Sequence, residues 1–255
     1  MAFSYVVLGA GRQGVALAYD LAKNCEAGRV RLADVSPAQV DSALARLRPL
    51  LPAMATQFEA VICDVSRPVE VAHALAGAGV VISAAPYRFN AELTEAAIAA
   101  GASFCDLGGN TTVVRQQLAQ HAAAEARGVS VVPDCGLAPG LANILAAHGV
   151  SQMDAPRDVH VRCGGLPQQP VGPLGYKLVF NFDGLINEYS GFGEFLRDGR
   201  RAAVPALTEL EEIEFAPPLG KCEAAVTSGG TSTCADSFAG RLRTYDYKTV
   251  RYPGH

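Results

Sequence analysis

The sequence predicts an α/β protein in which a doubly wound parallel sheet is followed by a second, α+β domain. Up to residue 149, short apolar runs alternate with longer amphipathic segments, which is the pattern of βαβ units. Beyond residue 149 the apolar runs are no longer separated by long helical segments. A chain of 255 residues can hold two modest domains. We therefore expect one domain over 1–149 and another over 150–255.

The first apolar run, residues 3–8, ends in the motif Gly9-Ala10-Gly11-Arg12-Gln13-Gly14, and an amphipathic segment follows. A strand, a glycine-rich turn and a helix in this order are typical of dinucleotide-binding sheets of the Rossmann type. We expect Gly9 to permit the turn, Gly11 to let the backbone approach a pyrophosphate, and Gly14 to let the helix pack on the strand. The helix N-terminus, with Arg12 and Gln13 in its first turn, would then direct N–H groups at the phosphates.

Asp34 supports this interpretation. It follows the second apolar run, residues 30–33, and lies twenty residues after Gly14. A carboxylate at this position accepts hydrogen bonds from the adenosine ribose of NAD and repels the 2′-phosphate of NADP. No arginine follows Asp34 closely. The sequence therefore predicts a dinucleotide site that prefers NAD.

The remaining elements of the first domain follow in order. Ser36 and Pro37 predict the start of a helix. The strand expected at 58–63 ends at Asp64, which either contacts the adenine or caps the turn that follows. A strand over 80–86 is apolar on both faces, as a buried parallel strand should be. Its last residues are small and leave room for the cofactor: Ser83, Ala84, Ala85 and Pro86. Beyond it we expect a helix over 90–100, a strand over 103–107, a long helix over 111–127, a strand over 129–132 and a helix over 141–148.

Ligands of such sheets bind beyond the carboxyl ends of the strands. Two further segments fall at this edge, residues 106–110 and residues 134–140. Asp134 opens the second of them, ahead of a Gly/Pro-rich loop and a new helix. A ligand role for Asp134 and a role as a loop or helix cap are both consistent with this position.

The second domain is expected to contain strands at 159–163, 177–182, 222–227 and 242–250, with a hairpin turn over 197–200. The run of Ser, Thr and Gly at 227–233 is typical of a flexible loop. Lys177 begins an otherwise apolar segment. Its side chain either reaches past the core to water or meets an anion or a reacting group.

Composition excludes several classes of protein. The seven cysteines are scattered without a Cys-x-x-Cys pair, and the five histidines form no close pair, so we expect no disulfide framework and no metal site. A net charge of −4 argues against binding nucleic acid. No apolar run approaches the length of a membrane span, so we expect a cytoplasmic protein without membrane contact.

Three motifs together resemble the saccharopine dehydrogenase family: residues 9–14, residues 134–140 and Pro173-Leu174-Gly175-Tyr176-Lys177. Four further stretches resemble its lysine 6-dehydrogenase branch: residues 164–167, 180–191, 208–215 and 227–233. The resemblance implies an N-terminal dinucleotide domain and a second domain that carries dimer contacts and substrate groups. Family members continue beyond the 251–255 segment, so we expect a truncated form with an incomplete second domain, and a homo-oligomer at full length.

The resemblance also implies a reaction. A hydride would pass from the amine-bearing carbon of L-lysine to the nicotinamide, giving an imine that hydrolyses to a semialdehyde or closes to a cyclic imine. Because an alkylammonium has no lone pair, the site needs a base or a lowered amine pKa. The candidates are Lys177, Tyr176 and Asp134. Lys177 can act as a base if desolvated or as a carboxylate anchor if charged, and the sequence does not choose between these roles.

Three alternatives remain open. Glu188 and Tyr189 either bind a substrate ammonium or are a surface acid beside a packed aromatic side chain. A saccharopine-type reductase, which joins an amino acid to a carbonyl compound, would need more arginines for its additional carboxylates. The obvious candidates for that role are Arg162, Arg241 and Arg243. The third alternative is a dinucleotide-binding protein without catalytic activity.

Overall fold

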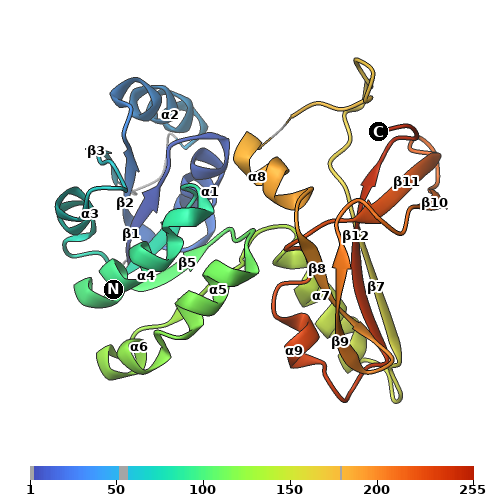
Figure 1. Ribbon diagram of the computed structural model, residues 1–255. Coiled ribbons are helices and arrows are strands. Elements are labelled where there is room, and N and C mark those ends of the chain that lie inside the picture. Colours follow the sequence, from blue (N-terminus) through green and yellow to red (C-terminus); the bar gives the residue numbers. More distant parts are fainter. Residues whose placement is uncertain (1–2, 52–56, 179) are drawn as a thin grey trace. The chain divides into compact units, whose positions relative to one another are not determined.

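The computed structural model describes residues 3–51, 57–178 and 180–255, which form two compact units (Figure 1). The first unit runs through Leu107 and includes residues 112–133, and the second comprises residues 108–111 and 134–255. The predicted boundary at residue 149 falls inside helix α7 (Leu141–Ser151). The structure assigns all of α7 to the second unit, because Ala142, Ala146 and Val150 pack into that unit's core. Each unit is described separately below.

The first unit contains a parallel sheet, as predicted. Among the described residues its strand order is β3-β2-β1-β4-β5-β6, so the order reverses between β1 and β4. At this switch point Leu8 pairs with both Ala33 and Ser83. The strands are β1 (Phe3–Leu8), β2 (Ala27–Asp34), β3 (Gln57–Ile62), β4 (Val80–Ser83), β5 (Ser103–Asp106) and β6 (Val131–Val132). The doubly wound α/β prediction is confirmed.

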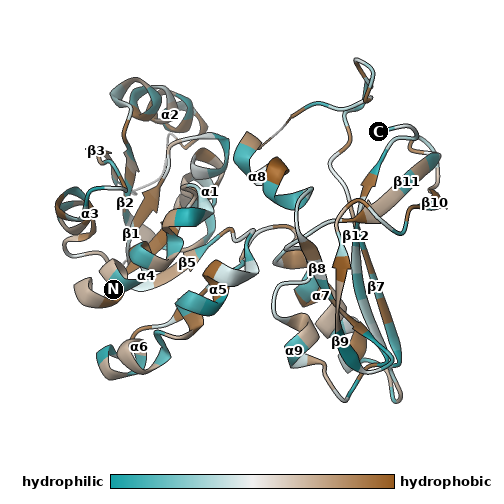
Figure 2. Cartoon of the chain, viewed as in Figure 1, coloured by the Kyte–Doolittle hydropathy of each residue, from teal (hydrophilic) through white to brown (hydrophobic). Residues whose placement is uncertain are grey.

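Helices cover both faces of this sheet. One core cluster contains Val7 with residues of α1 and α2, and the other contains Val6 and Leu8 with residues of α3 and α4. Strand β1 is therefore buried on both faces from Tyr5 to Leu8, which explains the apolar character of this part of the strand, brown in Figure 2. The helices are α1 (Arg12–Asn24), α2 (Pro37–Leu50), α3 (Pro68–Leu75), α4 (Asn90–Ala100), α5 (Thr111–Leu118) and α6 (His121–Arg127), with a 3₁₀ turn at Tyr87–Phe89.

One long helix over 111–127 was predicted, and this prediction is wrong. The segment breaks between α5 and α6, where the Gln120 amide bonds to the Gln117 carbonyl, three residues back, instead of continuing the α-helical pattern. The Gln120 side chain donates to the Ala91 carbonyl oxygen at 2.9 Å. Neither glycine nor proline marks the break, so the sequence carries no local signal for it.

The second unit is built on a mixed sheet with the order β10-β11-β12-β8-β9, and β7 pairs with β12 in parallel. The predicted hairpin turn is confirmed, with Asp198 and Gly199 both at positive φ. The strands are β7 (Asp158–Cys163), β8 (Phe192–Arg197), β9 (Arg200–Pro205), β10 (Glu211–Glu214), β11 (Lys221–Val226) and β12 (Thr244–Arg251). Helices α8 (Phe182–Glu188) and α9 (Cys234–Ser237) join α7 in this unit.

The strand predicted at 177–182 is not formed. Lys177 and Leu178 lie in a loop, Val179 lies outside the described residues, and helix α8 begins at Phe182. Asn181 caps this helix, because its side chain accepts a hydrogen bond from the Asp183 amide at 2.7 Å. The capping residue inside the apolar run was the signal for a helix start that the strand prediction overlooked.

Strand β12 separates two different environments. Tyr245 and Tyr247 point into the core that contains α7 and α9. The intervening Asp246 is 2% exposed and pairs with Arg162 at 2.7 Å and with Arg197 at 3.0 Å. In the part of the chain that the structure describes, no helix has the length and apolar character needed to cross a membrane.

Candidate functional site

The glycine-rich loop of the first unit has the geometry that its sequence predicts. Gly9 has a φ of 101°, and a Cβ there would lie 2.9 Å from the Ala84 carbonyl oxygen. A Cβ on Gly14 would lie 1.8 Å from the Gly9 carbonyl oxygen, so the loop and helix α1 require glycine there. A Cβ on Gly11 would meet no atom of the described residues within 4 Å. Gly9 and Gly14 therefore serve the fold, whereas Gly11 borders open space in which a phosphate can approach.

Helix α1 starts at this open space. Gly11 is its N-cap, and no side chain in the described part of the chain caps the helix. Arg12 and Gln13, in the first turn, are exposed. The N-terminus of a helix of 13 residues carries a partial positive charge and N–H groups that favour an anion. This end of α1 fits a pyrophosphate.

Asp34 holds the glycine-rich loop in place. Its Oδ2 accepts a hydrogen bond from the Ala10 amide at 2.9 Å, and its Oδ1 accepts one from the Ser36 amide at 3.0 Å. Each carboxylate oxygen retains acceptor capacity for a ribose hydroxyl. Sequence reasoning missed Gln39, whose Nε2 donates to the Ala10 carbonyl oxygen at 3.0 Å.

The end of β4 lies beside the same loop. The Ala84 amide donates to the Leu8 carbonyl oxygen at 2.7 Å, and Ala84, Ala85 and Pro86 remain partly exposed. Ser83 is 1% exposed and donates its hydroxyl hydrogen to Asn90 Oδ1 at 2.8 Å. Ala84 to Pro86 can therefore border a cofactor, while Ser83 anchors the helix that follows.

Asp64 forms the turn cap that was one of its two predicted roles. Its Oδ1 accepts hydrogen bonds from the Ser66 hydroxyl at 2.7 Å and the Ser66 amide at 2.9 Å. These bonds, with the nearby Arg67 charge, lower the pKa of Asp64. The capping interpretation is confirmed, and contact with an adenine stays a prediction.

In the second unit Asp134 joins three loops. It is 8% exposed, has a φ of 59°, and accepts hydrogen bonds from the Gly109 amide at 3.3 Å and from the Ser232 hydroxyl. A Cβ on Gly108 would lie 1.9 Å from Asp134 Oδ1, which shows how tightly the loops fit. In the chain, Gly108 closely follows strand β5, and Asp134 closely follows β6.

The loop at 227–233 is buried, so its interpretation as a flexible loop is wrong. Thr231 is 1% exposed, and the Thr227 and Thr249 hydroxyls share a hydrogen bond of 2.7 Å. Gly230 packs against the Tyr247 ring, where a Cβ would come within 2.3 Å. The small residues here permit close packing of loop on strand.

Asn143 of α7, which sequence reasoning missed, fixes this loop. Its Nδ2 lies 3.3 Å from the Gly230 carbonyl oxygen and 3.2 Å from that of Thr231. Its Oδ1 accepts a hydrogen bond from the Gly140 amide at 2.9 Å. An asparagine inside an apolar helix was the available signal.

Tyr176 and Lys177 have different surroundings although they are neighbours in the chain. The Tyr176 ring lies 4.8 Å from the Arg251 guanidinium and 5.2 Å from the His255 ring. Burial raises the pKa of Tyr176, against the lowering effect of Arg251. Lys177 is exposed, and among the described residues its amine has no hydrogen-bond or ion-pair partner. Asp134 belongs to a different cluster from Tyr176.

A second cluster surrounds Arg251 at the end of β12. Arg251 Nε donates to the Tyr189 hydroxyl at 2.9 Å, and that hydroxyl lies 2.7 Å from His255 Nε2. His255 Nδ1 lies 3.1 Å from the Leu174 carbonyl oxygen. Because a carbonyl only accepts, His255 Nδ1 is the donor to Leu174, and because Arg251 Nε donates to the Tyr189 hydroxyl, that hydroxyl can donate its own hydrogen toward His255 Nε2. This chain of bonds connects the segments around Leu174 and Tyr189, which both carried the family resemblance.

Glu188 belongs to this cluster and is not a surface acid. Its side chain is 24% exposed, and its Oε2 lies 3.6 Å from Arg251 Nη2. Burial raises the pKa of Glu188, while the Arg251 charge opposes that effect. Arg251 itself is 8% exposed. No spacing in the sequence pointed to Arg251 as a partner of Glu188.

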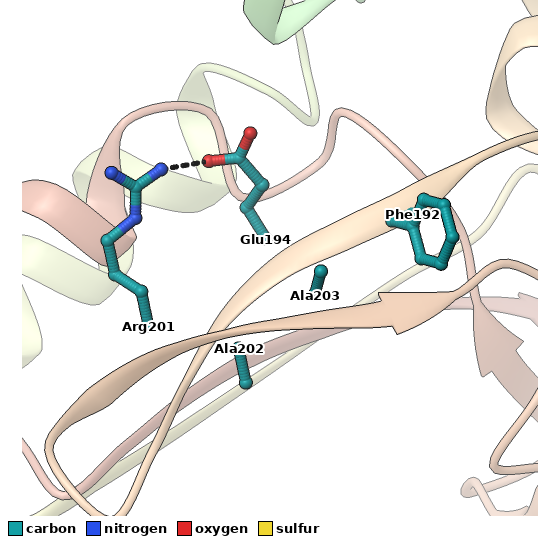
Figure 3. Close-up of a pocket in the computed structure, with 5 residues that line it drawn as sticks. All are labelled: Phe192, Glu194, Arg201, Ala202 and Ala203. Atoms are coloured by element: carbon teal, nitrogen blue, oxygen red, sulfur yellow. Dashed lines mark hydrogen bonds and ion pairs between the residues drawn. The ribbon is translucent and has the colours of Figure 1, made fainter.

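A hollow of about 410 Å³ lies on the β8–β9 hairpin and contains none of these candidate residues (Figure 3). It is lined by Phe192, Glu194, Arg201, Ala202 and Ala203. Arg201 pairs with Glu194 and with Asp236, each at 2.8 Å. Because acids of this unit already pair with its arginine, the hollow is not a candidate anion site.

Comparison with known families assigns both units. The saccharopine dehydrogenase NADP binding domain matches residues 5–132, and the saccharopine dehydrogenase C-terminal domain matches residues 136–255. The chain belongs to the saccharopine dehydrogenase family. This family is one of dehydrogenases that bind a dinucleotide. In the sequence, the boundary between the two matched domains, at residues 133–135, coincides with the division between the two units at Pro133 and Asp134.

A solved structure shows the same fold. Saccharopine dehydrogenase (L-Glu forming) from Saccharomyces cerevisiae superposes with a TM-score of 0.77 at 20% identity, over 99% of this chain and 56% of that one. The chain thus spans little more than half the length of the yeast protein. Apo scyllo-inositol dehydrogenase from Lactobacillus casei (TM-score 0.49, 14% identity, 98% and 68% of the two chains) is less similar. A shikimate 5-dehydrogenase from Mycobacterium fortuitum is also less similar, with a TM-score of 0.41 at 21% identity over 57% of this chain and 48% of that one.

Proposed function

We propose that this protein is an NAD-dependent dehydrogenase that oxidises the terminal amine of L-lysine, as in the lysine 6-dehydrogenase branch of its family. The observation that carries this choice is how the arginines of the second unit are used. Arg162 pairs with Asp246 at 2.7 Å and also with Glu211, and Arg243 pairs with Asp158 at 2.9 Å. They are two of the three arginines that the sequence offered for the additional carboxylates of a saccharopine-type substrate, and the guanidinium of the third, Arg241, lies 5.5 Å from the Phe238 ring. Their engagement favours a substrate with a single carboxylate.

The residues of the first unit fit a dinucleotide. The open side of Gly11 and the N-terminus of α1 would hold the pyrophosphate, and Asp34 would hold the adenosine ribose. The acidic ribose site supports NAD over NADP, because a 2′-phosphate would lie against a carboxylate. When bound, the nicotinamide accepts the hydride from the amine-bearing carbon.

The chain's own groups must supply a neutral amine. Asp134 accepts hydrogen bonds that hold three loops together, which favours a structural role. The pKa of Tyr176 is raised above an ordinary value that already lies well above neutral pH, so Tyr176 is protonated, can donate a hydrogen bond and is a poor base. Lys177 is exposed, which suits an anchor for the substrate's carboxylate, whereas a base role would require the side chain to be desolvated when the substrate is bound.

Initial rates of nicotinamide reduction test the proposal. We expect reduction of NAD with L-lysine as the only added amine. Activity that requires a second, carbonyl-bearing substrate would instead identify a saccharopine-type reductase. Binding of NAD without turnover of any amine would identify a protein that binds the dinucleotide without catalysing the reaction. L-Norleucine, which lacks the terminal amine, is the matched negative control.

A further inference from the structure

Glu188 and Arg251 form an ion pair without a hydrogen bond. The distance between Arg251 Nη2 and Glu188 Oε2 is 3.6 Å, and Glu188 Oε2 is buried without a hydrogen-bond partner among the residues that the structure describes. The other nitrogens of Arg251 are occupied, since Nε donates to Tyr189 and Nη1 donates to the Val250 carbonyl oxygen at 3.0 Å. The pair therefore retains one cationic donor and one anionic acceptor that a ligand can complete.

Both partners are held rigidly. The rings of Tyr176 and Tyr189 lie 4.8 Å and 5.7 Å from the Arg251 guanidinium. The Glu188 carbonyl oxygen accepts a hydrogen bond from the Ser228 amide at 2.9 Å. Residues that are fixed in this way bind a ligand without the cost of ordering their own side chains.

The preceding residue, Asn187, fixes the end of α8 further. Its Oδ1 accepts a hydrogen bond from Asn110 Nδ2 at 2.9 Å, and its Nδ2 donates to the Gly109 carbonyl oxygen at 2.5 Å. The Ser228 hydroxyl donates to the Asn187 carbonyl oxygen at 2.6 Å. The segment that carries Glu188 is thus joined to two of the loops that surround Asp134.

The charges of the pair match those of an α-amino acid. An α-amino acid carries an ammonium and a carboxylate on one carbon, and Glu188 and Arg251 place the complementary charges side by side. A carboxylate favours the protonated form of an amine beside it. Because the amine on the carbon that gives up the hydride must be neutral, Glu188 suits the ammonium that does not react.

We infer that Glu188 binds the α-ammonium of the substrate and that Arg251 binds its α-carboxylate, so that the far end of the side chain is left for oxidation. This inference rests on the proposed function for the identity of the reacting amine. The binding step itself can be measured without turnover.

Calorimetric binding of L-norleucine to the full chain tests the inference, because norleucine keeps the α-amino acid group and has no terminal amine. Glu188→Gln keeps the size of the side chain and removes its charge, and we expect norleucine to bind at least tenfold more weakly. The affinity of Glu188→Gln for 6-aminohexanoate, which keeps a carboxylate but lacks the α-ammonium, should differ less than threefold from that of the wild type. Arg251→Lys should weaken both ligands, because the planar guanidinium is lost.

Glu214→Gln and Arg200→Lys are matched controls on exposed positions of the same unit. Both should bind norleucine as the wild type does. Melting curves confirm that each variant is folded, and Glu188→Gln alone decides the question if Arg251→Lys does not fold. Wild-type protein that fails to bind norleucine, or Glu188→Gln that binds it normally, would overturn the inference even if lysine is oxidised. Norleucine binding that depends on Glu188, without oxidation of lysine, would support the inference and reject the proposed function.

Discussion

Asp34 Oδ2 accepts a hydrogen bond from the Ala10 amide at 2.9 Å, so the carboxylate at the end of β2 is attached directly to the glycine-rich loop. The other oxygen of Asp34 holds the turn that leads into α2 through the Ser36 amide. The carboxylate is therefore oriented by backbone groups on two sides. A ribose hydroxyl would meet an acceptor whose position is already set, which strengthens discrimination between ribose and its 2′-phosphate.

Asp34→Ala should weaken NAD binding by roughly tenfold, about 1.4 kcal/mol, and reduce the preference for NAD over NADP. Both effects follow from losing the acceptor and its negative charge. Titration of each dinucleotide by calorimetry measures them. Asp34→Asn, which keeps an acceptor but no charge, should retain NAD binding better than the alanine variant while tolerating NADP. Equal affinities of the wild type for NAD and NADP would show that the assignment is wrong.

Gly11→Val should abolish dinucleotide binding and leave the fold intact. The backbone at Gly11 is extended, with φ −71° and ψ −166°, and no atom of residues 3–51, 57–178 or 180–255 lies within 4 Å of the Cβ position. The protein therefore tolerates valine, which occupies the path of the pyrophosphate. Gly14→Ala is the contrasting variant. Its Cβ would lie 1.8 Å from a backbone oxygen, so it should lower stability by about 1–3 kcal/mol. NAD titration and urea unfolding separate the two effects, and unchanged NAD affinity in Gly11→Val would remove the loop from the binding site.

The first unit was predictable because its signals are local. The positive φ of Gly9, the contact of Gly14 with Gly9, the cap at Ser36 and the turn at Asp64 each depend on residues within a few positions. Parallel strands that are buried on both faces also have a recognisable apolar sequence. The break after Leu118 lacks such a signal, because Gln120 bonds to a carbonyl on a different helix.

The clusters of the second unit were not predictable, because their contacts join residues distant in the chain. Ser232 bonds to Asp134, and Arg251 bonds to Tyr189. A Ser/Thr/Gly run has the same composition whether it is exposed or buried, so only the packing of Gly230 on Tyr247 identifies it as a tightly fitted loop. The family resemblance found the segments that take part, while the partners required the structure.

Asp246→Asn should destabilise the second unit by about 3 kcal/mol at neutral pH, because it removes the acid shared by Arg162 and Arg197 at a nearly buried position. Burial alone would raise the pKa of Asp246, but the bond and charge of Arg162, with His160, bring it below its usual 3.8. A lowered pKa gives stability that is complete above the unfolded value and is lost as pH falls through the folded one. The free energy of unfolding of the wild type, measured with urea, should therefore decrease below about pH 4.

Asp246→Asn lacks this titrating carboxyl group, so its free energy of unfolding should fall less steeply than that of the wild type as the pH decreases below about 4. Asp198→Asn, at an exposed turn position with φ 49° that asparagine adopts readily, is the control and should follow the wild-type curve. If the free energy of unfolding falls equally steeply with decreasing pH in the wild type and in Asp246→Asn, Asp246 does not govern the acid sensitivity of this unit.

Lys177→Ala should lower turnover of L-lysine by at least tenfold with NAD affinity nearly unchanged, because a positioned acid–base group typically contributes about 100-fold or more. Lys221→Ala, which removes another exposed lysine from the same unit, is the control and should keep wild-type rates. Lys177→Arg separates the two roles left open for this residue. A guanidinium can replace an ammonium that anchors a carboxylate, so the anchor role predicts partial activity. A guanidinium does not lose its proton in the working pH range, so the base role predicts that Lys177→Arg loses as much turnover as Lys177→Ala. Steady-state kcat and KM for L-lysine, measured with NAD at saturation, distinguish these outcomes, and wild-type values for Lys177→Ala would exclude both roles.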